Sequence, residues 1–258
     1  MTTTGDTRAR ILGAATELFR RQGYAATGMK QIVATAQAPY GSAYHFFPGG
    51  KAQLGEEVLR TSGATYLALI GELFGPGAGH HDDPVLATRD AFAGAAVTLE
   101  ELDFADPCPV ATVALEVAST HEGLRLTTSE IFTSWTDALA AYYAGHGIAA
   151  AQDTAGSVIA LLEGAFMLGR AHRRTEPVLA AATAAQAIVS AALVVSDVAA
   201  STVWAKTAQS EVTIGPRTPD SEILPRVVNR GGVPSVRGVS TRWTDGAEPS
   251  SLRGRTAR

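Results

Sequence analysis

The chain has 258 residues, which is enough for one large domain or two small ones, and its formal net charge at pH 7 is −4. Its single cysteine, Cys108, excludes an internal disulfide framework and is typical of a reducing compartment. The first ten residues, MTTTGDTRAR, lack the apolar run of a signal peptide, so we expect a cytoplasmic protein.

Charge is unevenly distributed along the chain. Residues 1–60 carry seven basic and four acidic side chains, a net charge of +3, and residues 61–200 carry five and sixteen, a net charge of −11. Residues 201–258 carry nine and five, a net charge of +4. A basic head on an acidic body is typical of a DNA-binding domain fused to a second domain, although ordinary variation in a protein surface also produces an excess of this size.

An amphipathic helix is expected from Arg8 to Gln22, ended by Gly23. The residues that form its apolar face are Ile11, Leu12, Ala15, Leu18 and Phe19. Thr27 is expected to cap the N-terminus of the next helix. Because a helix N-terminus also binds phosphate, Thr27 is a candidate for a DNA backbone contact as well.

The segment 29–51 predicts a helix-turn-helix. A short helix over 30–34 is followed by a turn holding Gln37 and Pro39, and then by a second short helix over 40–46 that a Pro-Gly-Gly sequence ends. Such a motif places its second helix in the major groove of DNA.

The order and spacing of residues over about 8–59 resemble the tetracycline-repressor (TetR/AcrR) family of bacterial regulators. The matching positions are Leu18, Phe19, Gly23, Tyr24, Thr27, Gly41, Ser42, Tyr44 and Phe47. The resemblance implies an all-α protein with an N-terminal three-helix DNA-binding domain and a C-terminal helical domain for ligand binding and dimerisation. It also implies a homodimer on double-stranded operator DNA.

The helix-turn-helix departs from the family pattern at two positions. Gln37 stands where the family usually has glycine, so it must accept some backbone strain or a different turn. Tyr40 stands where the recognition helix usually opens with lysine or arginine, and its phenol brings no charge, which leaves the preferred DNA sequence open.

Ten residues around the second helix are expected to contact DNA, with Tyr44 and His45 reaching phosphate or base and Lys51 meeting phosphate at the start of the next helix. The full set is Thr27, Lys30, Gln31, Pro39, Tyr40, Gly41, Ser42, Tyr44, His45 and Lys51. Packing in the core is the alternative for an aromatic residue on a short helix, and it is the expectation for Phe46 and Phe47.

Six further helices are expected after the head. Five of them have the ranges 51–74, 84–101, 122–144, 153–174 and 177–199, and the other follows the segment 106–110 and ends at Ala118. Thr183, Ser190 and Asp197 interrupt the most apolar stretch, 178–199, which we interpret as a buried helix of a soluble protein without a membrane partner.

The loop 75–83 contains two histidines and two aspartates in a row, which are His80, His81, Asp82 and Asp83. They could ligate a metal, but adjacent residues rarely face one ion and no second ligand motif accompanies them. We therefore expect a solvated loop, with no metal and no cofactor.

Short phrases in the body are similar to the LmrA/YxaF-like branch of the same family: CPV from Cys108, IFTSW from Ile131 and LEGA from Leu162. The resemblance implies a drug-like or flavonoid effector. The apolar body also favours an apolar aromatic ligand over a phosphate ester, because pockets for small molecules are mostly apolar.

The effector region is expected between Phe92 and Arg170, with Trp135 and Phe166 stacking on a planar ligand and Glu163 or Arg170 orienting a polar end. The candidate lining residues are Phe92, Cys108, Phe132, Trp135, Leu139, Phe166, Met167 and Arg170. For each of them taken singly a place in the core is favoured over contact with a ligand, so the set marks a region.

Small residues at every fourth position, Gly156, Ala160 and Gly164, predict a close helix contact. We expect a dimer interface built from the helices 153–174 and 177–199, and packing within one subunit is the alternative. Residues 201–258 are rich in Pro, Gly, Ser and Arg and are expected to be disordered.

The expected organisation is therefore a DNA-binding domain over 1–52, an effector-binding and dimerisation domain over 53–200, and the tail. No catalytic or nucleotide-binding motif is found, so an enzyme is not expected. The sequence predicts a repressor that a small hydrophobic molecule releases from its operator. The alternative is a dimeric DNA-binding protein without an effector.

Overall fold

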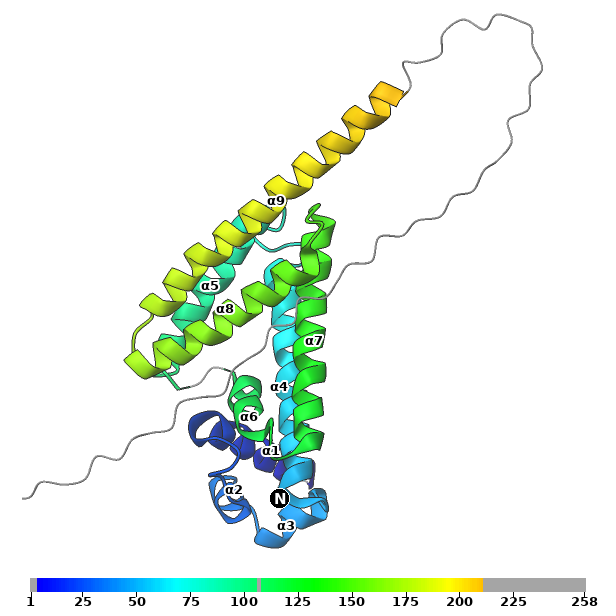
Figure 1. Ribbon diagram of the computed structural model, residues 1–258. Helices are drawn as coiled ribbons and strands as arrows, with labels where there is room; N and C mark the ends of the chain where they lie inside the picture. The colour runs from blue at the N-terminus through cyan, green and yellow to red at the C-terminus, as the bar shows by residue number, and fades with distance from the viewer. Residues whose placement is uncertain (1–3, 106–107, 211–258) are drawn as a thin grey trace, which may run out of the picture. The chain divides into compact units, whose positions relative to one another are not determined.

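The computed structural model describes residues 4–105 and 108–210, with the side chains of 6–105 and 108–196 (Figure 1). Every regular element in this part of the chain is a helix, which confirms the expected all-α class. In chain order the helices are α1 Thr4–Gln22, α2 Met29–Thr35, α3 Tyr40–Phe46, α4 Gly50–Phe74, α5 Pro84–Glu101, α6 Pro109–Val117, α7 Glu122–Gly145, α8 Ala151–His172 and α9 Glu176–Ser210.

The helices α3 and α5 have the expected bounds at both ends. The last helix differs most from expectation, because α9 continues to Ser210 and so includes the first ten residues of the segment expected to be disordered. The reason is local: residues 201–210 lose the apolar repeat but contain neither glycine nor proline, so nothing in them stops a helix. The rest of that segment, 211–258, lies outside the described residues.

Helix α6 completes the hydrophobic core of the N-terminal helices. In that core, which we call the head core, residues of α1, α2 and α4 cluster with residues of α6 and the first half of α7, and α6 contacts α1, α4 and α7 directly. Its largest fully buried members from the head are Ile11, Phe19, Ile32, Phe47, Leu54 and Leu59, and the body contributes Cys108, Val110, Val113, Val117, Leu124, Ile131 and Trp135. The expected domain boundary at residue 52 thus falls inside α4, and the segments on its two sides share one hydrophobic core.

The sequence of α6 explains its place in the head core. Cys108 is the N-cap residue, and its Sγ accepts a hydrogen bond from the Ala111 backbone N–H at 3.4 Å. Pro109 follows at the first helical position, which suits a residue without an N–H. Val110, Val113 and Val117 then fall on one face at helical spacing and are all buried.

Helices α4 and α7 lie side by side and run in the same direction away from the head (Figure 1). Gly63 permits their close approach, because a Cβ there would lie 2.8 Å from the Ile131 side chain. At the same crossing the indole N–H of Trp135 donates to the Gly63 carbonyl at 2.9 Å. The position and orientation of Trp135 are therefore fixed by the backbone of α4.

Helix α9 has one buried face and one exposed face. Its buried residues, packed against α5 and α8, are Val178, Ala182, Ala185 and Val189. Its exposed large apolar residues are Leu179, Val194 and Val195. By length and composition 176–196 could span a membrane, and only 22% of this apolar stretch is buried in the single chain. The interpretation as a buried helix therefore holds for one face only.

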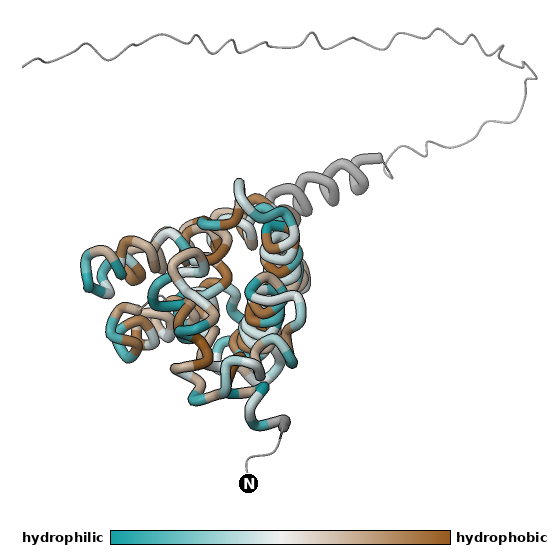
Figure 2. The backbone as a smooth tube through the Cα atoms, turned by 90° about the horizontal axis from the view of Figure 1, so that it is seen from below, coloured by the Kyte–Doolittle hydropathy of each residue, from teal (hydrophilic) through white to brown (hydrophobic). Residues whose placement is uncertain are grey.

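Apart from this exposed face, hydrophobic and hydrophilic residues alternate along the helices, as expected for helices with one side in a core (Figure 2).

The second core, which we call the body core, is formed by α5, α7, α8, α9 and the end of α4. Its largest fully buried members are Phe92, Leu99, Tyr143 and Ile148.

Candidate DNA-binding and effector sites

Helices α2 and α3 are joined by a tight turn in which Gln37 has a φ of 50°. This is the left-handed region that favours glycine, so of the two expected alternatives the strained backbone is the one observed. The Gln37 N–H donates to the Ala34 carbonyl at 3.1 Å and the Ala38 N–H to the Val33 carbonyl at 2.9 Å. These bonds hold α3 at a fixed angle to α2.

Helix α3 presents two tyrosines side by side on the surface of the head. Tyr40 and Tyr44 are each 46% exposed, their rings meet edge to face with centroids 5.6 Å apart, and their hydroxyls are 3.4 Å apart. The hydrogen bond with Tyr40 raises the pKa of Tyr44, so the Tyr44 phenol remains a neutral donor at physiological pH. Opposite them, Ala43 is buried against the head.

Most of the other DNA-contact candidates also lie at the surface of α2 and α3. The exposed ones are Lys30, Gln31, Pro39, Gly41 and His45, and Ser42 is half-buried. Gln31 is held by a reciprocal pair of amide hydrogen bonds with Gln22, at 2.8 and 3.1 Å. As expected for core residues, Phe47 is fully buried and Phe46 is half-buried.

Thr27 does not cap α2, and this expectation is wrong. The N-cap residue is Gly28, which makes no side-chain cap. Thr27 is only 1% exposed, and its hydroxyl donates to the Gly23 carbonyl at 2.7 Å. The loop after α1 turns back on itself and satisfies this hydroxyl internally, so the Thr27 side chain fixes the loop and is buried.

Lys51 lies at the start of α4, half-buried against the loop between α1 and α2. Its Nζ is 4.2 Å from the centroid of the Tyr24 ring and donates to the Ala25 carbonyl at 3.4 Å. Burial lowers the pKa of Lys51, and the nearby Glu116 carboxylate opposes this shift. The ammonium group is thus positioned by the head itself.

The arginines of α1 are engaged with carboxylates of the head. Arg8 pairs with Glu57, Arg10 with Asp6 at 2.9 Å, and both Arg20 and Arg21 with Glu17. Lys30, in contrast, is exposed and makes no ion pair within the part of the chain that the structure describes.

Two polar contacts tie the body to the end of α1, and sequence reasoning missed both. The Glu116 carboxylate on α6 accepts a hydrogen bond from the Ala25 backbone N–H at 2.6 Å. The Arg170 guanidinium on α8 donates to the Arg21 carbonyl at 3.1 Å. These partners are 91 and 149 residues apart, so no local pattern could have indicated them.

A largely apolar cavity of about 250 Å³ lies between α4, α5, α7 and α8. Four of the eight predicted effector residues line it: Phe92, Trp135, Leu139 and Phe166. Other lining residues are Tyr66, Ile70, Leu73, Phe74, Val158 and Leu162. The Tyr66 and Trp135 rings lie 5.4 Å apart with 31° between their planes. Glu163 supplies a carboxylate at the cavity wall.

A second hollow, of about 560 Å³, is a groove between α6 and α8. Phe166 lines both hollows, whereas Met167 and Arg170 line the groove alone, together with Leu115 and Glu116. The remaining two candidates line neither hollow. Cys108 is fully buried in the head core, and Phe132 packs edge to face on Trp135 with centroids 5.3 Å apart.

Sequence analysis could not distinguish the candidates that line a cavity from those that pack in a core, because both positions are occupied by the same kinds of apolar side chain. The two that line neither hollow are therefore left out of the effector site.

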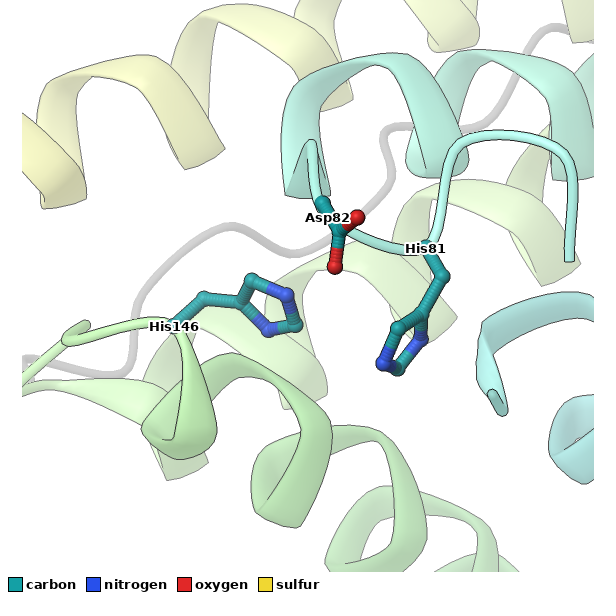
Figure 3. Close-up of side chains that lie close together, drawn as sticks. All are labelled: His81, Asp82 and His146. Carbon is teal, nitrogen blue, oxygen red and sulfur yellow. The ribbon is translucent and has the colours of Figure 1, made fainter. Parts of the chain in front are cut away.

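Three potential metal ligands meet at the far ends of α4 and α7. His81 and Asp82 come from the loop after α4, and His146 directly follows α7 (Figure 3). Their ligand atoms all lie within 4.8 Å of one another. The loop is also packed, since His81 is half-buried and the Tyr142 hydroxyl donates to its carbonyl at 2.8 Å. Sequence reasoning missed this group because it considered only neighbours in the chain.

Comparison with known proteins gives matches over both parts of the chain. Residues 11–58 match the family described as bacterial regulatory proteins, tetR family, and residues 84–184 match the C-terminal domain of LmrA/YxaF-like transcriptional regulators. The uncharacterized HTH-type transcriptional regulator YxaF of Bacillus subtilis is 34% identical over 181 residues, which are 69% of this chain and 93% of that protein. The HTH-type transcriptional regulator LmrA of the same organism is 30% identical over 184 residues, 68% of this chain and 92% of that protein.

Solved structures show the same fold. A regulatory protein TetR from Rhodobacter sphaeroides superposes with a TM-score of 0.64 and 20% identity, over 70% of this chain and 98% of that one. The reduced form of Escherichia coli NemR superposes with a TM-score of 0.62 and 20% identity, over 71% of this chain and 97% of that one. At this identity the likeness is one of architecture.

Proposed function

The chain belongs to the tetR family of bacterial regulatory proteins and carries an LmrA/YxaF-like C-terminal domain, and on this premise we propose that it is a repressor that a small hydrophobic molecule releases from its operator. Regulators of this family bind operator DNA and act as dimers. The proposed place of action is the bacterial cytoplasm, where operator DNA lies.

The proposed DNA-reading surface is the exposed side of α3 together with the start of α2. Tyr40, Tyr44 and His45 offer hydrogen-bond donors, and Lys30 adds a charge without an ion pair within the described residues. Contacts with phosphate fix the register of such a helix, and contacts with base edges carry the sequence preference. Lys51 is proposed as a phosphate contact at the margin of this surface.

The proposed dimer interface is formed by α8 and α9. A Cβ placed on Gly156 or Gly164 would have no heavy atom of its own chain within 4 Å, apart from its neighbours in the helix, and Ala160 between them is exposed. A partner helix could therefore approach this stripe closely, and the exposed apolar face of α9 supplies further surface to bury. The dimer would hold two copies of α3 about 34–36 Å apart, one turn of DNA.

The observation that carries the proposal of an effector is the cavity between α4, α5, α7 and α8. Aromatic rings line it, and its volume of about 250 Å³ lies just below the range of about 300–1,000 Å³ for pockets of drug-sized ligands. A flat apolar molecule of modest size suits the space between Phe92, Trp135 and Phe166. The Glu163 carboxylate could orient a hydroxyl or an amine on it.

Two residues of this cavity also reach the elements that hold the head. Trp135 is part of the head core, and Phe166 lines the groove beneath α6. Close-packed interiors transmit displacements, so a ligand that shifts these rings would shift α6 and with it the Glu116 carboxylate bound to Ala25. By linkage, the ligand would weaken DNA binding by the factor by which DNA weakens ligand binding.

The test uses the intrinsic fluorescence of Trp135. The chain has two other tryptophans, Trp204 and Trp243, so a W204F/W243F double variant isolates the signal. Hydrophobic aromatic compounds are screened for quenching of this signal, and each hit is titrated against a labelled promoter duplex followed by anisotropy.

Quenching together with release of DNA at matching concentrations supports the proposal. If no compound changes either signal while the protein still binds its promoter, the alternative of a DNA-binding dimer without an effector is the better one. Quenching without release would reject the coupling through α6.

A further inference from the structure

We propose that His81, Asp82 and His146 form a binding site for a divalent transition-metal ion, at the end of the body remote from the DNA-reading surface. The site is separated from the start of α4 by the 25 residues of that helix, roughly 37 Å at the usual rise of about 1.5 Å per residue. The loop after α4 and the end of α7, whose histidines are 65 residues apart in the chain, meet there, so a bound ion would join the two segments.

The geometry is close to that of a bound ion. The three ligand atoms lie within 4.8 Å of one another, and Figure 3 shows both rings and the carboxylate turned toward a common space. Bonds of about 2.0–2.1 Å in a tetrahedral site place ligands roughly 3.3–3.4 Å apart. Asp82 is exposed, so its carboxylate can rotate toward the two imidazoles without displacing a packed group, and binding of an ion would draw the three ligands together.

The hydrogen bonds of the two imidazoles supply an independent observation. Nδ1 of His81 lies 2.9 Å from the Phe74 carbonyl oxygen, and Nδ1 of His146 lies 2.8 Å from the Tyr142 carbonyl oxygen. A carbonyl oxygen only accepts, so each Nδ1 must carry the hydrogen, and each Nε2 then carries a lone pair. A histidine that binds metal typically donates its other ring N–H to a carbonyl or carboxylate in this way.

The surroundings favour a cation. His146 is the C-cap residue of α7, where the partial negative charge of the helix end stabilises positive charge. Asp83, next to the site, uses one carboxylate oxygen to accept the Val85 and Leu86 N–H groups as the N-cap of α5. It therefore adds negative charge beside the site while its own position is fixed.

The ligand set selects the class of ion. Two imidazole nitrogens and one carboxylate suit Zn²⁺, Co²⁺, Ni²⁺ or Cu²⁺, whereas Mg²⁺ and Ca²⁺ prefer oxygen ligands throughout. Three protein ligands leave a fourth position for water or a small anion.

A bound ion would act on the end of the effector cavity. Phe74, whose carbonyl orients His81, lines that cavity, and its ring lies 5.1 Å from the Tyr142 ring at the end of α7. Joining the loop after α4 to the end of α7 would therefore fix the wall formed by Phe74. The metal ion would thus be a second ligand of the body, distinct from the apolar effector proposed above, and its binding can be measured without DNA.

The experiment measures Zn²⁺ binding to the full chain by calorimetry, with any affinity tag removed, and repeats it with Co²⁺, whose visible absorption reports nitrogen ligands and tetrahedral geometry. Two variants remove one ligand each while keeping side-chain volume, His146→Gln and Asp82→Asn. The matched control is His80→Gln, since His80 is in the same loop but pairs with Asp90 at 2.5 Å instead of facing the site.

The expected result is one ion per chain for the wild type and for His80→Gln, with affinity lower by at least about tenfold in His146→Gln and Asp82→Asn. The same variants should lose the rise in melting temperature that Zn²⁺ gives the wild type. Wild-type affinity in His146→Gln would overturn the proposal, as would the absence of Zn²⁺ binding to the wild type or an equal loss in His80→Gln. Melting temperatures without metal show whether each variant is folded. If His146→Gln does not fold, Asp82→Asn, at an exposed position, decides the test, and wild-type affinity in it would overturn the proposal.

Discussion

Replacing Lys51 by methionine tests whether the start of α4 contacts the DNA backbone. Methionine keeps an unbranched apolar stem against the Tyr24 ring but removes the charge that lies 4.2 Å from the ring centroid. Lys51 already donates to the Ala25 carbonyl, so it could serve the packing of the head alone or also contact a phosphate, and the two roles predict different results. If it serves only the packing of the head, DNA binding should not change; if its ammonium neutralises a phosphate, the salt dependence of binding should change.

The size of the effect follows from counterion release. Each neutralised phosphate contributes about 0.9 to the slope of log K against log salt, and a dimer has two copies of Lys51, so the slope should decrease by about 1.8. Between 50 and 200 mM salt the wild type should therefore lose about 12-fold more affinity than Lys51→Met. If the two curves converge at 1 M salt, the variant binds about 60-fold more weakly at 0.1 M.

The assay is fluorescence anisotropy of a promoter duplex across this salt range. Arg60→Met is the matched control, because Arg60 lies on the same helix but pairs with Glu56 and Glu130 on the side of the body. It should leave the slope unchanged. Equal slopes for Lys51→Met and the wild type would refute the phosphate contact and leave Lys51 as a packing residue of the head.

Four other outcomes are expected. Tyr44→Ala, at an exposed position, should weaken DNA binding about 30-fold, since about 1 kcal/mol is lost per hydrogen bond and a dimer loses two, with an unchanged melting temperature; unchanged affinity would remove Tyr44 from the reading surface. Gly164→Leu should separate the two subunits, and sedimentation that still shows a dimer would place the interface elsewhere. Burial raises the pKa of Tyr143, and the hydrogen bond that it shares with Thr88 opposes this shift, so above about pH 10 the unfolded chain loses the phenolic proton and the folded chain keeps it. The contribution of Tyr143 to stability should then be constant below pH 10 and fall by about 1.4 kcal/mol per pH unit above it, and denaturant titrations should show this loss reduced in Tyr143→Phe. Deleting 211–258 should leave the melting temperature unchanged, because that segment has no periodic apolar face; a large decrease would show that it packs on the rest.

The helices were predictable where the chain itself carries the stop and start signals. Pro84 at the first turn fixes the start of α5, and the Pro-Gly-Gly sequence at 48–50 fixes the end of α3. The sequence also marked Gln37 as a position of either backbone strain or a different turn, and the structure shows the strain. In each of these cases the cause lies within a few residues of its effect.

The site was less predictable because its decisive contacts are not local. Thr27 has a good capping side chain, yet the loop after α1 uses its hydroxyl one residue before the cap position. Glu116 and His146 gave no signal at all, since each acts on a partner that only the folded chain brings near. Cys108 could not be assigned from sequence either, because a thiol suits both the wall of a ligand pocket, where we expected it, and a buried helix N-cap, where it lies.

The sharing of the head core between α1, α4 and α6 has a practical consequence for building hybrid sensors from this protein. Cutting the chain in α4 and grafting residues 1–52 onto the body of another regulator would leave α1, whose Ile11 and Phe19 are buried in this core, without the helix α6 that packs against it. A transplantable DNA-reading unit must therefore include residues 108–117, or the recipient must supply an equivalent helix with a carboxylate in place of Glu116 to receive the Ala25 N–H. Because the DNA-reading unit consists of two separate segments of the chain, a single cut cannot separate it from the body.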